Sequence, residues 1–142
     1  MFPTSYVGQV LSVEGELVNG EFVADTVFDL PVRGGYSLQV AVEAKPGVFV
    51  LSDPPPLSGT LEIRSNQTIL HTFRGNYKIG GPFRSYAGGP SGLPEGVLLG
   101  WLHVPQDVPI GTGFQGTIKV TVTDPTFYEK YGSHVKVFLE KT

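Results

Sequence analysis

The chain has 142 residues, no cysteine and a formal net charge of −3 at pH 7. This length suits one domain with one core, and the lack of cysteine excludes disulfides, thiolate catalysis and zinc sites that use cysteine. The small negative charge argues against nucleic acid as a partner, and no apolar stretch approaches the roughly 18 residues of a membrane span.

The charges are unevenly distributed along the chain. Residues 1–62 hold eight acids and two bases, a net of −6, whereas residues 63–94 hold four bases and no acid, a net of +4. Residues 95–142 hold five acids and four bases, a net of −1. Such segments are usually solvated surface, but opposed charges can also align neighbouring molecules.

Strand signals recur along the whole chain. Asn19-Gly20 lies between two short apolar runs and predicts a hairpin, because both turn residues must tolerate positive φ. Ser65-Asn66 predicts a second hairpin between 60–64 and 68–74. Alternation of apolar and polar residues with a period of two predicts further strands, at 36–44, 61–64, 118–123 and 135–139.

Other segments show different patterns. Val97 to Val104 is apolar on both parities, which is typical of a central or doubly covered strand. Asp53 to Pro56 and Gly75 to Glu95 are rich in proline or glycine and predict loops, the second of them longer than usual. Asp124, Pro125 and Gly132 supply the cap, first turn and end of one short helix near 125–131.

These elements predict one all-β domain over residues 1–142. About eight to ten strands at short intervals favour a two-sheet antiparallel β-sandwich, of the immunoglobulin-like or jelly-roll kind, with a closed barrel as the alternative. The sequence contains no internal repeat and no linker that would divide it.

One motif suggests nucleotide binding but lacks the required context. Residues 111–116 read G-T-G-F-Q-G, which matches the dinucleotide fingerprint. That site needs a strand before the glycines and a helix after them, so that helix amides meet the pyrophosphate. Here two prolines precede the glycines and a β-pattern follows, so we expect no cofactor at this position.

Catalytic and metal signatures are also weak. His71, His103 and His134 are spread over 64 residues without the close pairs that seed metal sites, although the fold could bring them together. No G-x-S-x-G elbow is present. The prediction is therefore a protein that is not an enzyme, with no catalytic, cofactor or metal residues assigned.

The long loop carries the most distinctive side chains. Its aromatic and basic residues are interleaved among glycines, and both types are enriched at contact sites. The predicted contact surface comprises Arg74, Tyr77, Lys78, Phe83, Arg84 and Tyr86. An equally weighted interpretation is that these aromatic rings fold back and cap one end of the sandwich.

The segment Val104-Pro-Gln-Asp-Val-Pro-Ile-Gly-Thr112, with the strand 116–123 after it, resembles a phrase of bacterial extracytoplasmic immunoglobulin-like and fibronectin-III-like sandwich modules. The resemblance covers about 20 residues. It implies a penultimate strand pair, an accessory role and no catalytic residue. Here Gly113-Phe114 interrupts the point where an aromatic residue usually follows directly.

The sequence as a whole predicts a structural or interaction module that acts through its surface. Its partners would be another protein or further copies of itself, in a cell-surface or virion-type assembly. The alternatives are a carbohydrate-binding module that stacks sugars on the loop aromatics or Trp101, and a metal-dependent enzyme on the three histidines. The first residues, Met1 to Val13, show no signal peptide. The cell surface or a virion is favoured over the cytoplasm because of the predicted structural role, and not because of an export signal.

Overall fold

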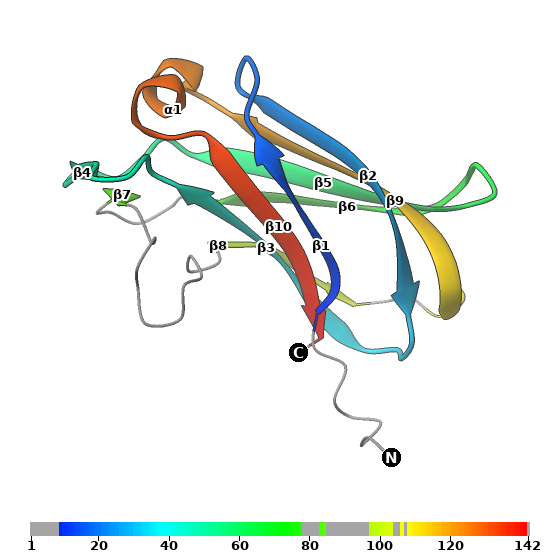
Figure 1. Ribbon diagram of the computed structural model, residues 1–142. Helices are drawn as coiled ribbons and strands as arrows, with labels where there is room; N and C mark the ends of the chain where they lie inside the picture. The colour runs from blue at the N-terminus through cyan, green and yellow to red at the C-terminus, as the bar shows by residue number, and fades with distance from the viewer. Residues whose placement is uncertain (1–8, 78–82, 85–96, 104–105, 107, 142) are drawn as a thin grey trace.

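The computed structural model describes residues 9–77, 83–84, 97–103, 106 and 108–141. They form two four-stranded antiparallel sheets, a two-stranded ribbon and one short helix (Figure 1). Sheet A contains, in spatial order, β1 (Gln9–Glu16), β10 (His134–Lys141), β3 (Gly35–Glu43) and β8 (Val97–His103). Sheet B contains β2 (Glu21–Leu30), β9 (Gly111–Val122), β5 (Leu57–Ser65) and β6 (Thr68–Tyr77). The ribbon pairs β4 (Phe49–Val50) with β7 (Phe83–Arg84), and the helix is α1 (Pro125–Tyr131).

This architecture confirms the predicted all-β sandwich. Along the chain, the eight long strands alternate between the sheets, except for the β5–β6 hairpin within sheet B. That alternation is the connectivity of a jelly roll, one of the two sandwich types that the sequence left open. It differs from the strand grouping of immunoglobulin constant domains, in which the first two strands share a sheet.

The sandwich has two different ends. The β1–β2 turn, the β4–β7 ribbon and α1 lie at one end (Figure 1). At the opposite end Gln9 of β1 pairs with Glu140 of β10, so the first and last strands begin and finish side by side.

Inward residues of both sheets build one core. The tightest positions belong to alternating strand residues such as Val40, Leu61, Val120 and Val137, none of which is exposed to solvent. Gly116 lies where β9 passes under Phe28, and a Cβ there would approach the Phe28 ring to 2.9 Å. The third glycine of the dinucleotide-like motif thus serves packing within a strand.

The first predicted turn is present, but its predicted hairpin is not. Asn19 and Gly20 have φ of 53° and 78°, as the turn requires. Only the Val18–Glu21 bridge closes across it, and β1 and β2 then enter different sheets. The turn therefore links the two layers of the sandwich.

Three further predictions differ in part from the structure. β6 extends to Tyr77 and β7 occupies 83–84, so the predicted loop 75–95 contains strand residues at both places, and its remaining residues lie outside the described ones. β8 was expected to be a central or doubly covered strand, but it is the edge strand of the described sheet A and pairs with β3 alone there. The alternation in β3 would put Ser37 and Ala41 on a solvent-exposed face, yet both are buried, because they are small and lie inside the sheet. The β5–β6 hairpin and the helix were predicted correctly.

Candidate functional site

Phe83 is a packing residue at the α1 end. Its side chain is 2% exposed, and its ring centroid lies 5.4 Å from Phe127 and 5.9 Å from Tyr128 of α1. Phe83 belongs to the predicted contact surface, but its ring is buried and is not available for contact with a partner. The interpretation that aromatics cap the sandwich describes Phe83 correctly.

The structure describes the other members of the predicted contact surface to different extents. Arg74 is exposed on β6, where it pairs with Thr60 of β5. The side chains of Tyr77 and Arg84 lie outside the described part of the structure, as do Lys78 and Tyr86 altogether. The contact surface as a whole stays a prediction, with Arg74 its one described exposed residue.

The outer face of sheet B carries mostly polar side chains, which the strand register arranges in rows. Rows of residues cross all four strands in the order β2, β9, β5, β6. Three successive rows are Val23, Lys119, Thr60, Arg74; then Asp25, Thr117, Glu62, Thr72; then Val27, Gln115, Arg64, Ile69. Side-chain bonds run along these rows, such as Thr117 Oγ1 donating to Asp25 Oδ1 at 2.6 Å.

The β2 edge of this face is acidic. Glu21, Asp25 and Asp29 point outward at every fourth residue, alternating with the exposed Val23 and Val27. Each carboxylate has a partner on the β9 side: Lys119 Nζ lies 3.2 Å from Glu21 Oε2, Arg64 Nη2 lies 3.6 Å from Asp25 Oδ1, and the Gly113 amide donates to Asp29 Oδ1. In each of these contacts only one of the two carboxylate oxygens is engaged.

The β6 edge, at the other side of the same sheet, carries a basic residue and no acid. Residues 68–77 contain Arg74 and His71 and no acid. Ile69 is 57% exposed on the outer face, and Arg74 forms no recorded ion pair with a described residue. In the described chain no strand pairs with the outer edge of either β2 or β6.

Two shallow hollows flank Val27, which is 69% exposed. One, of about 410 Å³, is lined by Asp25, Thr26, Arg64 and Gln115, and the other, of about 380 Å³, by Gln9, Val10, Asp29 and Pro31. Val27 therefore stands as a small apolar ridge on the acidic edge, with room on both sides for side chains of another chain.

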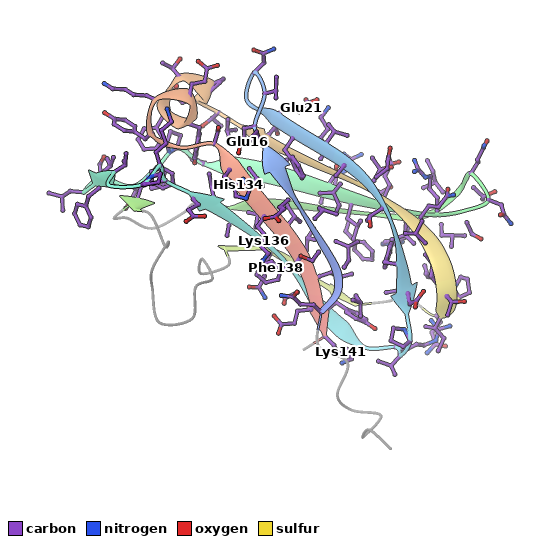
Figure 2. The ribbon with its side chains drawn as sticks, in the orientation of Figure 1. Glu16, Glu21, His134, Lys136, Phe138 and Lys141 are labelled. Atoms are coloured by element: carbon purple, nitrogen blue, oxygen red, sulfur yellow. The ribbon has the colours of Figure 1, made fainter. Side chains whose placement is uncertain are left out.

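A second polar cluster lies on sheet A near α1. The ring of His134 on β10 contacts two carboxylates of β1, with Nδ1 3.0 Å from Glu16 Oε1 and Nε2 3.1 Å from Glu14 Oε2. Ser133 Oγ donates to Glu16 Oε2 at 2.8 Å. Figure 2 shows Glu16 at the end of β1 beside His134. Beside them is a hollow of about 410 Å³, lined also by Glu43, Lys45 and Gly132.

The interactions in this cluster favour the protonated form of His134 and the ionised form of Glu16. The hydrogen bond that His134 donates to Glu16 raises the pKa of His134 above its ordinary value, against partial desolvation. The hydrogen bond from Ser133 lowers the pKa of Glu16. Ser133 and His134 bond to the same carboxylate and not to each other, so the arrangement lacks the nucleophile-to-base bond of covalent catalysis.

Sequence reasoning did not find this cluster. The outward positions of Glu14 and Glu16 follow from alternation, but their proximity to His134 depends on the β1–β10 register, in which Glu16 pairs with His134. That register joins residues 118 positions apart, and the local pattern carries no signal for it.

The histidines do not converge in the described part of the fold. His71 lies on β6 of sheet B with its ring centroid 4.3 Å from Phe73, and His134 lies on β10 of sheet A. The side chain of His103 lies outside the described residues. Among the residues described, no group of three or more metal-ligating side chains could hold an ion, so the metal-enzyme alternative has no described site.

Comparisons with known proteins give no family. No family model matches the chain, and no curated protein matches it. Solved structures that align with it include the VP2 subviral particle of infectious bursal disease virus and the Gx strain of that virus, at 10% and 11% identity. The alignments cover 94% and 95% of this chain and 35% of each viral chain, with TM-scores of 0.22 and 0.23. This chain thus spans about a third of their length, and the likeness is too low to support any argument.

Among the described helices, none has the length and hydropathy required to cross a membrane.

Proposed function

We propose that this chain is a non-enzymatic structural or interaction module that acts through its surface, in a cell-surface or virion-type assembly. The observation that carries the proposal is the outer face of sheet B. It is a polar, four-stranded surface with an acidic edge at β2 and an acid-free, Arg74-bearing edge at β6. Complementary charge at exposed edges directs association with other chains.

The jelly-roll connectivity agrees with this role by analogy. Jelly rolls form capsid and lectin domains, and also cupins, so the fold alone does not select a function. The proposal for this chain therefore depends on its own surface. The resemblance of 104–123 to extracytoplasmic sandwich modules points to the same accessory class and stays a proposal.

The test is where the protein resides in its source. Particles and envelope or wall fractions are separated from soluble protein on density gradients, and the chain is quantified by mass spectrometry in each. We expect it at a fixed ratio to the major surface or particle protein through several gradients, with removal only by agents that dissolve the assembly. A chain found only among free soluble proteins would contradict the proposal.

Carbohydrate binding is the second candidate, and one observation favours it. Phe49 of β4 is 59% exposed at the α1 end, beside the register position of Arg84. An exposed phenyl ring is a surface on which a sugar can stack. Titration of soluble polysaccharides against the wild type and Phe49→Ala, followed by calorimetry, separates the roles: heat lost in the variant supports sugar binding, and no heat in either rules it out for the sugars tested.

A further inference from the structure

We infer that copies of this chain join edge to edge, with β6 of one copy pairing antiparallel with β2 of the next, so that sheet B continues from molecule to molecule. This inference rests on the proposed function and names its partner as a second copy. The contact is heterologous, since two different edges meet, and it builds open arrays or rings.

Strand direction permits the pairing by simple translation. Within sheet B, β2 is antiparallel to β9, β9 to β5, and β5 to β6. β2 and β6 therefore run in opposite directions at the two edges. A translated copy places its β2 antiparallel to β6, which is the pairing used throughout the sheet.

The side-chain rows match across such a junction. If the next copy continues the sheet without a stagger, Ile69 faces Val27 of the neighbouring copy, and Thr72 faces Asp25 of that copy. Arg74 then faces Val23 of the neighbouring copy, with Glu21 and Asp25 of that strand as its diagonal neighbours. Directly opposed and diagonal pairs are the ones that interact on a sheet.

The exposed apolar side chains at the junction, Ile69 and Val27, have space to pack against each other. Ile69 and Val27 are both more than half exposed in the single chain. Hollows lie on both sides of Val27, so an isoleucine approaching from the edge can enter the space beside it. Burying these two side chains against each other removes apolar surface from water, which favours association.

The charged part uses atoms that the single chain leaves available. Arg64 and Thr117 both engage Oδ1 of Asp25, and Lys119 engages Oε2 of Glu21. Among the described residues no side chain engages Oδ2 of Asp25 or Oε1 of Glu21, so these oxygens can accept from a guanidinium of a second copy. Arginine is suited to this position because its planar fork can contact two carboxylates at once.

Self-pairing of β2 is disfavoured by the same acids. A two-fold axis at Asp25 places Asp25 opposite its own copy and Glu21 opposite Asp29, and an axis at Val23 places Glu21 opposite Asp25. Like charges directly opposed across strands are destabilising. In these two registers acids oppose acids, whereas pairing with β6 places no acid opposite an acid in any register, because β6 has none.

The test uses three single variants of the full chain, each checked for folding by circular dichroism and thermal unfolding. Val27→Lys blocks the β2 edge, Ile69→Lys blocks the β6 edge, and Leu51→Lys places the same charge at an exposed apolar residue of the α1 end. By sedimentation velocity at low salt, we expect species larger than the monomer for the wild type and Leu51→Lys. Val27→Lys and Ile69→Lys should each be monomeric.

A mixture of the two blocked variants tests whether β2 of one copy pairs with β6 of another. Each retains one intact edge of opposite kind, so an equimolar mixture should form a heterodimer that grows no further. A dimer in Ile69→Lys alone would instead indicate β2 self-pairing, and a monomeric wild type would overturn the inference. If the wild type is monomeric but still resides in the particle or envelope fraction, the proposed function stands and only this partner is wrong.

Discussion

His134 and Glu16 join the last strand of the domain to the first, with His134 Nδ1 3.0 Å from Glu16 Oε1. Because β1 is an edge strand of sheet A, the cluster of Glu14, Glu16, Ser133 and His134 is a side-chain tie that holds this edge to β10 in addition to the backbone ladder. The tie has a pH dependence that can be measured.

The histidine contribution should fade as the pH rises. The pKa of His134 is raised in the folded chain, so its stabilisation is fully present below the ordinary histidine value of about 6.5 and is lost as the pH passes above the folded pKa. Glu16 has a lowered pKa, so its share is present above about pH 4.5 and is lost in more acidic solution. Both groups are partly exposed, so we expect less than about 1 kcal/mol in total.

Urea unfolding from pH 5 to 8.5 checks this prediction. The difference in unfolding free energy between the wild type and His134→Gln should be largest near pH 5.5 and shrink toward pH 8.5. Leu51→Gln, at an exposed residue without a titratable group, serves as the control and should give a difference without this trend. A constant His134→Gln difference across the range would contradict the assigned pairing.

Tyr128 anchors α1 to the proline-rich loop. Its hydroxyl donates to the Pro55 carbonyl at 2.6 Å, and burial raises its pKa. Tyr128→Phe should destabilise the fold by about 1–2 kcal/mol, because the carbonyl loses a partner in a buried setting. The Tyr131 hydroxyl forms no hydrogen bond with a described residue, so thermal unfolding of the control Tyr131→Phe should show a smaller change.

Asp124 caps α1 by accepting a hydrogen bond from the Phe127 amide. Asp124→Ala should lower the unfolding free energy by about 1 kcal/mol. Asp124→Asn retains a capping oxygen and should lose a few tenths at most. Equal losses in the two variants would show that charge, and not the capping bond, is responsible.

Phe83 distinguishes packing from contact. Phe83→Ala should cost about 3 kcal/mol, because it leaves a cavity against Phe127 and Tyr128. Phe49→Ala, in the paired strand of the same ribbon, should change stability by less than about 0.5 kcal/mol, since its ring is exposed. Chemical unfolding of both variants gives the comparison, and a neutral Phe83→Ala would contradict the buried position.

Local chemistry predicted the local elements well. Asp124, Pro125 and Gly132 marked α1 because capping depends on neighbours in sequence, and Asn66 marked the β5–β6 turn for the same reason. At Asn19-Gly20 the same reasoning predicted the turn but not the pairing of the strands on either side of it. The turn formed, but whether two strands then pair or enter separate sheets is decided by packing across the whole core.

The candidate surface could be predicted only in part. The acidic first segment and the basic middle segment were visible as charge counts. That β2 and β6 lie at opposite edges of one sheet, with Val27 and Ile69 in one row, depends on strand order and register. Those are long-range properties, so the sequence indicated opposed charges without placing them.

Sedimentation velocity of the unmodified chain at rising concentration tests the central claim most directly. At about 0.02 M salt the mean sedimentation coefficient should rise with concentration, and at about 1 M salt, where the screening length falls to about 3 Å, the rise should be much smaller. A single monomer boundary at every concentration and both salt levels would contradict the account of sheet B as a self-associating surface.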